Sequence, residues 1–474
     1  MSKLSAVVIG DVMVDYLVRG VSTRMAPEAP VPVFTPKSTD VLPGGAANVA
    51  ANLAAMGVKT LLIGAVGRDS AGRDLEHACS KVHDLHVRLV VGNDSTTVTR
   101  TRYAVNSSYL LRVDSAGTLN VNAAEVLQTL TQALDSGEVN VVVVADYGRG
   151  TMQDISFQLV GLCAKYKVPL IVDAKPACLQ QYAGASLVKV NLSEAAEYVS
   201  SWCGHLAMLY DDVSSQAEVV AKKMLEQLRT PVVIVTTGEH GAVVVCGNYA
   251  ASRCGVSVVA VDTTGAGDTF LAAITRQFGL SATLSEAVDW ANLASSIAVG
   301  RMGTAVVSLG DVAEQKASQP PGVITHDEAI ALVKKWKDEG DTVVFTNGCF
   351  DLFHAGHMSL LRTAGSMGRR LVVAVDSDES VRAAKGADRP RQTTAQRAES
   401  VSYYADAVVV FNGRELDSLV SRMLPSVLVK GAEYEGKRVV GADAVLADGG
   451  HLRFVEMVPD ISTTAIIAST KQEV

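Results

Sequence analysis

Short runs of apolar residues alternate with longer amphipathic stretches through the first two thirds of the chain. Each run is rich in valine, isoleucine and leucine, as is typical of strands buried on both faces of a parallel sheet. The stretches between them, such as 154–166 and 215–228, have apolar residues at helical spacing. This order predicts an α/β fold of βαβ units, with ligands at the carboxyl ends of a mainly parallel sheet. The predicted strands are 7–10, 60–66, 141–145, 169–173, 187–191, 232–236 and 242–246.

The alternation breaks after Val307 and then starts again. The polar stretch that follows contains Pro320 and Pro321, which cannot continue a helix or join the interior of a sheet. A helix is predicted to begin near His326, and the apolar runs beyond it predict a second, Rossmann-like domain. We therefore predict a first domain of residues 1–315, a linker of residues 316–325 and a second domain of residues 326–474, with strands at 342–346, 371–375, 407–411 and 427–429.

A different pattern occupies residues 97–114, where Arg100, Arg102, Tyr103 and Arg112 stand at roughly alternate positions. Alternation of this kind predicts strands. We expect a small β lid that projects from the first sheet and covers a site or pairs with another subunit. The alternative is a solvated hairpin whose arginines have no specific partner.

The composition narrows the possible functions. With 42 basic and 50 acidic residues the net charge is −8, which argues against a nucleic-acid partner. The seven cysteines form no Cys-x-x-Cys pair, so we expect reduced thiols rather than disulfides or a zinc site. No apolar run approaches the roughly 20 residues of a membrane span. These features predict a soluble, cytoplasmic protein without a membrane partner.

Residues 262–270 read Asp-Thr-Thr-Gly-Ala-Gly-Asp-Thr-Phe and should form a turn that opens a helix. Gly265, Ala266 and Gly267 are small, so their backbone amides can approach an anion at the positive end of the helix dipole. Asp268 would lie beside a transferring phosphoryl group and could accept the proton of an attacking hydroxyl. Asp262, just before the turn, is a candidate acid that either supports Asp268 or associates with a metal ion. A Gly-x-Gly turn alone would indicate only a helix entrance.

An earlier segment suits a ligand with many hydroxyl groups. Gly44 and Gly45 form a turn, and Asn48 follows at a predicted helix start. Sugars need convergent hydrogen-bond donors and acceptors, which Asp11, Asp15 and Asn48 could supply from neighbouring strand ends. Each of these residues taken alone is more often a cap or part of a turn.

Together, the Gly-Gly-Ala-Ala-Asn segment at 44–48 and the turn at 265–268 resemble the two signatures of ribokinase-family sugar kinases. The resemblance implies that Asp268 is the catalytic base. It also implies an Asn-x-x-Glu element that influences magnesium and phosphate, and a loop that binds ATP. The residues that match these elements are Asn191 and Glu194, then Thr236, Gly238 and Gly241, with Asn292 near the adenine.

Residues 354–357 read His-Ala-Gly-His, after a predicted strand and at the start of a helix. Both imidazoles of His354 and His357 could donate N–H groups to phosphates, while Gly356 leaves room for a nucleotide. The chemistry would then be positioning and charge stabilisation, without a covalent intermediate, with Mg²⁺ screening the triphosphate. Zinc binding is the alternative, but no third ligand is evident nearby, and we predict no metal site built from protein ligands.

This second motif resembles that of cytidylyltransferase-like nucleotidyltransferases. Class I aminoacyl-tRNA synthetases share the His-x-Gly-His turn, but neither a Lys-Met-Ser-Lys-Ser loop nor a basic tRNA surface is apparent. The resemblance implies that Lys430 and a Ser-Thr-Thr helix start lie near the β and γ phosphates of ATP. The matching residues are Asn347, Gly348, Phe350, Asp351, Arg397, Lys430, Ser462, Thr463 and Thr464.

Kinase first and nucleotidyltransferase second, at this length, is similar to the bifunctional heptose kinases and adenylyltransferases of lipopolysaccharide core synthesis. The resemblance implies phosphorylation of D-glycero-β-D-manno-heptose 7-phosphate at O1 with ATP. It also implies transfer of AMP to heptose 1-phosphate, which gives ADP-heptose and pyrophosphate. In that family a separate phosphatase acts between the two steps. We also expect a homodimer formed through the first domain.

Arg100, Arg102 and Lys175 are our candidates for binding the 7-phosphate, because cationic side chains bind phosphate oxygens. Two segments depart from the family pattern: Asp173-Ala174-Lys175 stands where Asp-Pro-Lys is usual, and residues 391–405 match loosely apart from Arg397. A fused kinase and transferase for another sugar or polyol phosphate is one alternative function. A nucleotide sensor without catalysis is another, which the intact Asp268 disfavours.

Overall fold

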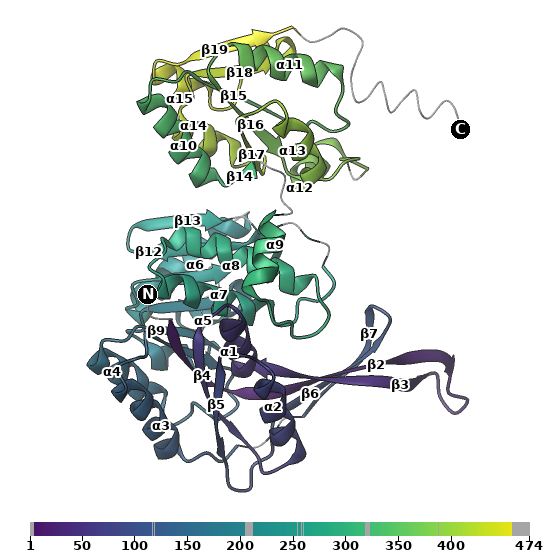
Figure 1. Cartoon of the computed structure of the whole chain (residues 1–474), viewed down its shortest axis with the longest axis vertical. Coiled ribbons are helices and arrows are strands. Elements are labelled where there is room, and N and C mark those ends of the chain that lie inside the picture. The colour runs from purple at the N-terminus through teal and green to yellow at the C-terminus, as the bar shows by residue number, and fades with distance from the viewer. Residues whose placement is uncertain are drawn as a thin grey trace. The chain divides into compact units, whose positions relative to one another are not determined.

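The computed structural model describes residues 4–115, 117, 119–203, 212–253, 255–256, 258, 260–317, 323–386 and 388–456. The chain divides into two compact units, Met1–Gln315 and Lys316–Val474 (Figure 1). No helix in these ranges is long and apolar enough to cross a bilayer.

A nine-stranded sheet forms the centre of the first unit. Its order is β13-β12-β11-β10-β9-β8-β1-β4-β5, and all neighbours are parallel except the β11–β12 and β12–β13 pairs. Every strand predicted for this domain is present, which confirms the α/β fold. The strands are β1 Ser5–Gly10, β4 Lys59–Val66, β5 Leu85–Val91, β8 Val141–Asp146, β9 Leu170–Ala174, β10 Leu187–Asn191, β11 Val233–Thr236, β12 Ala242–Cys246 and β13 Tyr249–Arg253.

Helices cover both faces of this sheet, so its central strands β1 and β8 are mainly apolar and buried. On β8, Val141 and Val143 belong to one core and Val142 and Val144 to the other, as expected when successive side chains point to opposite faces. The first core includes α1 Ala46–Ala55, α2 Ser70–Ser80, α7 Ala266–Gly279, α8 Leu284–Val299 and α9 Leu309–Ala317. The second includes α3 Ala123–Asp135, α4 Ser156–Tyr166, α5 Leu192–Cys203 and α6 Val213–Leu228, with the short 3-10 helix η1 Leu179–Tyr182.

The β lid is a separate four-stranded sheet of order β3-β2-β6-β7. It extends away from the helical layers of the first unit (Figure 1). Its strands are β2 Val12–Met25, β3 Pro32–Gly45, β6 Thr99–Val105 and β7 Ser108–Ser115. The sequence predicted β6 and β7 but not the long β2–β3 hairpin, because that segment lacks a regular alternation of apolar and polar residues. Arg102 on β6 is buried against Asp15, so the alternative of a hairpin whose arginines lack partners is wrong for this residue.

The second unit has a six-stranded parallel sheet of order β14-β17-β16-β15-β18-β19 between two apolar cores. Its strands are β14 Val323–Ile324, β15 Val343–Gly348, β16 Arg370–Asp376, β17 Ala407–Phe411, β18 Val427–Gly431 and β19 His451–Val455. Its helices are α10 His326–Asp338, α11 Ala355–Ser366, α12 Asp378–Lys385, α13 Thr394–Ser402, α14 Leu416–Met423 and α15 Ala442–Ala447, with the 3-10 helix η4 Ala432–Tyr434. Of the predicted linker, residues 316–317 close α9, residues 323–324 form β14, and residues 318–322 lie outside the described ranges.

Two candidate active sites

The glycine-rich turn of the first unit opens α7, as predicted. Gly265 caps the helix with φ 77°, a left-handed conformation that glycine adopts without strain. A Cβ atom there would also lie 2.8 Å from the Asn48 side-chain amide. Gly265, Ala266 and Gly267 therefore bring the start of α7 close to α1, and Asp268 lies in the first turn of α7.

The Asp268 carboxylate has two hydrogen-bond partners from elements far apart in the sequence. Asn48 on α1 donates its amide to Oδ2 at 2.9 Å, and the Tyr147 hydroxyl donates to Oδ1. Burial raises the pKa of Asp268 to about 6, because desolvation outweighs these two bonds, which favour the charged form. Asp173 raises the pKa further, whereas Lys189 lowers it. A carboxylate of this kind can accept a proton near neutral pH.

Lys189 is a site residue that the sequence analysis missed. It is only 4% exposed, and its Nζ lies 2.7 Å from Asp173 on the neighbouring strand β9. A Cβ atom at Gly267 would lie 3.2 Å from this ammonium group, so Lys189 lies directly against the glycine-rich turn. A charged residue inside the apolar run 187–191 was the available signal, because lysine is rarely buried without a partner.

Asn191 and Glu194 meet where β10 passes into α5. The Asn191 side chain accepts from the Glu194 backbone at 2.8 Å, and Glu194 Oε2 accepts from the Asn191 backbone at 3.1 Å. Lys175 reaches the same place, with its Nζ 2.6 Å from Glu194 Oε1 and 5.8 Å from the centre of the Tyr147 ring. Lys175 therefore pairs with Glu194, whereas Arg102 pairs with Asp15.

Asp11 organises the loop after β8. Its carboxylate is fully buried and accepts backbone hydrogen bonds from Tyr147, Arg149 and Thr151 at 2.8–3.0 Å. Both carboxylate oxygens thus hold the loop that places Tyr147 beside the Asp268 carboxylate. Gly45, which precedes α1, has a φ angle of 60° and lies against the backbone of Asp11, where a Cβ atom would be 2.5 Å from the Asp11 carbonyl oxygen.

Asp15 forms a buried ion pair with Arg102 at 2.6 Å. Its other oxygen, Oδ2, is buried without a hydrogen-bond partner among the described residues, and a Cβ atom at Gly44 would lie 2.6 Å from it. Burial raises the pKa of Asp15 in spite of Arg102. Arg100, on the same strand as Arg102, pairs with Asp114 at 3.4 Å. Asp15 Oδ2 is therefore an acceptor that a sugar hydroxyl could use, as the predicted sugar-binding role requires.

The predicted nucleotide loop begins at Thr236, the last residue of β11. Gly238 and Gly241 have φ angles of 65° and 94°, which shape the turn into β12. Asn292 on α8 is buried and donates to the Arg253 carbonyl at the end of β13 at 3.3 Å. Asn292 therefore contacts the edge of the sheet, and its role near adenine stays a prediction.

In the second unit, His354 caps α11 and His357 lies in its first turn. The two rings stack at 3.8 Å between centroids, with an interplanar angle of 18°, and Gly356 between them is buried. Phe350 and Phe353 enclose His357 at 5.3 and 5.7 Å. Both Nδ1 atoms lack a hydrogen-bond partner among the described residues. Burial lowers the pKa of His357 to about 4, so this ring is neutral at physiological pH.

Lys430 lies beside this motif at the end of β18, next to β15. Its Nζ donates to the Asn347 carbonyl at 3.2 Å and lies 4.9 Å from the centre of the Tyr434 ring. Burial lowers the pKa of Lys430 to about 8. Asn347 and Gly348 are the last two residues of β15, so the strand ends bring Lys430 and the motif together.

Asp351 is buried and holds the loop between α12 and α13. Its Oδ1 accepts from the backbone of Arg391 at 2.8 Å and of Gln392 at 3.3 Å, and its Oδ2 lies 3.0 Å from Arg389 Nε. The motif aspartate therefore binds the segment at 391–405 that matches the family loosely.

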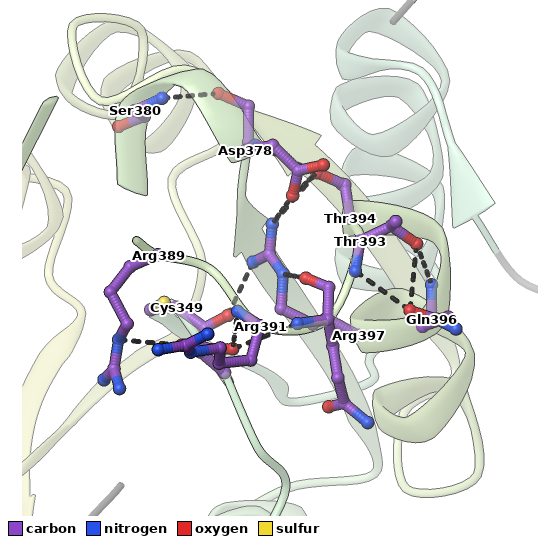
Figure 2. Close-up of polar contacts among 12 residues, drawn as sticks. Cys349, Asp378, Ser380, Arg389, Arg391, Thr393, Thr394, Gln396 and Arg397 are labelled. Atoms are coloured by element: carbon purple, nitrogen blue, oxygen red, sulfur yellow. Dashed lines mark hydrogen bonds and ion pairs between the residues drawn. The ribbon is translucent and has the colours of Figure 1, made fainter. Parts of the chain in front are cut away.

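Arg397 completes the link between this segment and the motif (Figure 2). The side chain is 0% exposed. It donates to the carbonyls of Cys349 and Gln392 at 2.6 and 3.0 Å, to Asp378 at 2.7 Å and to the Thr394 hydroxyl at 2.9 Å. Through these contacts Arg397 joins the motif to α12 and α13, and its role in binding ATP stays a prediction.

Three predicted residues, Ser462, Thr463 and Thr464, lie outside the described ranges. Within those ranges, no group of three or more histidine, cysteine, aspartate or glutamate side chains is arranged to hold a metal ion.

Comparison with known proteins assigns each of the two units to a family that the sequence motifs had indicated. Residues 3–309 match the pfkB family of carbohydrate kinases, and residues 345–469 match the cytidylyltransferase-like family. Phosphofructokinase-2 from Escherichia coli shares the fold of the first unit, with a TM-score of 0.54 at 20% identity, over 67% of this chain and 99% of that one.

Two relatives that match over nearly their whole length are both named bifunctional protein HldE. The protein from Azorhizobium caulinodans is 38% identical over 98% of both chains. The protein from Pseudomonas paraeruginosa is 35% identical over 98% of this chain and 97% of its own. The chain therefore belongs to the HldE family of bifunctional proteins, with a sugar kinase unit followed by an adenylyltransferase unit.

Proposed function

We propose that the first unit phosphorylates D-glycero-β-D-manno-heptose 7-phosphate at O1 with ATP, which gives the 1,7-bisphosphate. The second unit then transfers AMP from ATP to heptose 1-phosphate, which gives ADP-heptose and pyrophosphate. The observation that carries this proposal is the presence of both sites in one chain that matches HldE proteins over 98% of its length.

In the kinase reaction, the Asp268 carboxylate takes the proton of the attacking O1 hydroxyl. Asn48 and Tyr147 hold this carboxylate in place. The amides of the glycine-rich turn and the nearby Lys189 ammonium stabilise negative charge on the transferring phosphoryl group. Mg²⁺, when bound to ATP, would neutralise phosphate charge, and the Glu194 carboxylate suits such a hard cation, directly or through water.

In the adenylyl transfer, a phosphate oxygen of heptose 1-phosphate attacks the α-phosphorus of ATP and pyrophosphate leaves. His354 and His357 can each donate a ring N–H to the phosphate oxygens that gain charge. The ammonium group of Lys430 attracts the departing phosphates. Ser462, Thr463 and Thr464 would contact the same phosphates.

The two reactions do not connect directly, because the first product has a phosphate at O7 that the second substrate lacks. A separate phosphatase must act between them. Arg100, Arg102 and Lys175 remain the candidates for holding the 7-phosphate. We also propose that the protein is cytoplasmic and forms a homodimer. The lid strand β7 exposes Leu110, Leu111 and Val113, and a second kinase unit could cover these apolar side chains.

The test uses two variants, each given heptose 7-phosphate, ATP, Mg²⁺ and the phosphatase. Asp268→Asn should leave the starting sugar unchanged, whereas His357→Ala should accumulate heptose 1-phosphate. Mass spectrometry identifies the sugar phosphates. If the unaltered protein acts instead on another sugar phosphate in a substrate screen, then the fold and the roles stand but the heptose assignment does not.

A further inference from the structure

Tyr109 links the lid to the turn that binds phosphate. It lies on β7, the outer strand of the lid, and its side chain is 38% exposed. Its hydroxyl donates a hydrogen bond to Oδ2 of Asp262, which lies 153 residues further along the chain. Asp262 stands immediately before the turn at 263–267. A residue at the surface of the lid thus contacts the entrance to the catalytic helix.

Asp262 is the residue that fixes this entrance. Its Oδ1 accepts from the backbone amide of Thr264 at 2.9 Å, and its Oδ2 accepts from the amide of Gly303 at 2.7 Å. One carboxylate therefore connects the phosphate-binding turn to the loop after α8. The Tyr109 hydroxyl is a third donor to the same carboxylate, and a bond to a charged acceptor is stronger than one between neutral groups.

Tyr109 also lies close to the lid residues that are predicted to bind the sugar. The guanidinium of Arg102 lies 6.0 Å from the centre of the Tyr109 ring, and Arg102 forms the buried pair with Asp15. Two further lid residues, Leu17 and Leu42, lie close to Gly303, since a Cβ atom there would be 3.4 and 2.9 Å from them. The lid therefore contacts the Asp262 carboxylate itself and the loop after α8 that this carboxylate holds.

We propose that the Tyr109 hydroxyl is a positioning group of the kinase site: by fixing Asp262, it holds the amides of residues 264–267 in the direction of the transferring phosphoryl group. This inference rests on the proposed kinase function of the first unit. Tyr109 itself touches neither ATP nor the sugar in this role. The pairing of β7 with β6 does not depend on the hydroxyl, so its removal leaves the lid folded.

A positioning role of this kind affects the transition state more than substrate binding. Tyr109→Phe should therefore lower kcat of the kinase roughly tenfold, as expected for one lost hydrogen bond to a charged group. The KM for the sugar phosphate should stay within about twofold. Adenylyl transfer by the same chain should be unchanged, which gives an internal control.

The experiment compares the whole protein with Tyr109→Phe, Asp262→Asn and the double variant. If the hydroxyl acts through Asp262, its removal has little further effect in the Asp262→Asn background. The matched control is Tyr249→Phe, which removes a hydroxyl on the kinase surface that bonds Ser285 at 2.9 Å. An equally large fall in kcat in both backgrounds would overturn the inference.

Hydrogen exchange gives a readout that needs no substrate. In Tyr109→Phe the amides of Thr264 and Gly303 should exchange faster, whereas in Tyr249→Phe they should not. Unchanged exchange together with unchanged kcat would refute the role of Tyr109 and leave the proposed function intact. Faster exchange in a protein that fails to phosphorylate heptose 7-phosphate would support the positional link and reject only the heptose assignment.

Discussion

The side-chain amide of Asn48 donates a hydrogen bond of 2.9 Å to the carboxylate of Asp268, although 220 residues separate them. The bond joins the two kinase signatures, one at the start of α1 and the other at the start of α7. Asn48 is fully buried and is itself bonded to Asn52 one turn later. The Asp268 carboxylate is thus oriented from the opposite motif, and the hydrogen bond from Asn48 lowers its pKa.

The first prediction concerns the pH dependence of the kinase. Asp268 must be deprotonated to act as a base, and its pKa is raised to about 6. Activity is therefore present above this pKa and is lost as the pH falls through it. We expect kcat/KM for the sugar to fall about tenfold per pH unit below the pKa. Steady-state kinetics should show this fall on the acid side of the pH profile of the kinase, which we call its acid limb. A value of kcat/KM that stays constant down to about pH 5 would contradict Asp268 as the base.

The second prediction tests the contact between the motifs. The hydrogen bond from Asn48 favours the charged form of Asp268 and lowers its pKa. Asn48→Ala should therefore raise that pKa and move the acid limb of the kinase to higher pH by about one unit. The matched control is Asn140→Ala, which removes an exposed contact with the Ser5 backbone. If the acid limb of the kinase moves equally in both variants, the hydrogen bond from Asn48 does not set the pKa of Asp268.

The third prediction separates catalysis from stability at Lys189. Lys189→Met alone leaves Asp173 buried without its cation and should be destabilising. Replacing both, as Lys189→Met with Asp173→Leu, removes the unpaired charge and should restore much of the thermal stability. The kinase kcat of the double variant should stay about a hundredfold low, because the ammonium beside Gly267 is missing. Recovery of kcat together with stability would show that Lys189 is only structural.

The sequence predicted those parts of the sites that depend on neighbouring residues. The turn at 262–268 and the histidine pair are local, so residue type and spacing were enough to place them on helix starts. Lys189 and Tyr109 could not be placed in this way, since their partners are distant in the sequence: Asp173 lies on β9, and Asp262 lies in the loop before α7. The long β2–β3 hairpin was missed because neither strand alternates: β2 is buried at consecutive positions in its first half, and most of β3 is exposed.

Arg397 shows the same limit in the second unit. The family pattern marked this arginine as an ATP ligand, and that role stays a prediction. The structure shows instead a fully buried side chain whose partners come from α11's preceding loop, from α12 and from its own helix. Spacing in a sequence indicates that a residue matters near a site, but it does not distinguish contact with a ligand from support of the backbone.

The fourth prediction concerns the alkaline side of adenylyl transfer. The pKa of Lys430 is lowered to about 8 by burial, so its positive charge is lost as the pH rises through that value. Adenylyl transfer should therefore decline above about pH 8, while His357, with a pKa of about 4, stays neutral throughout. Lys430→Arg keeps a cation at high pH and should remove the limb, even if its longer side chain lowers the rate. A decline that persists in Lys430→Arg would assign the limb to another group.

The fifth prediction concerns the stability of the second unit. Arg397→Met removes a cation that is paired with Asp378 and leaves two backbone carbonyls without their donor. Breaking a buried pair of this kind costs about 3–5 kcal/mol. Arg422→Met is the control, because its pair with Asp327 is largely exposed and should contribute less than about 1 kcal/mol. Heating the full chain should inactivate adenylyl transfer in Arg397→Met well before the kinase, whereas Arg422→Met should behave as the unaltered protein. Equal thermal inactivation of the two variants would show that the buried network around Arg397 does not stabilise the unit.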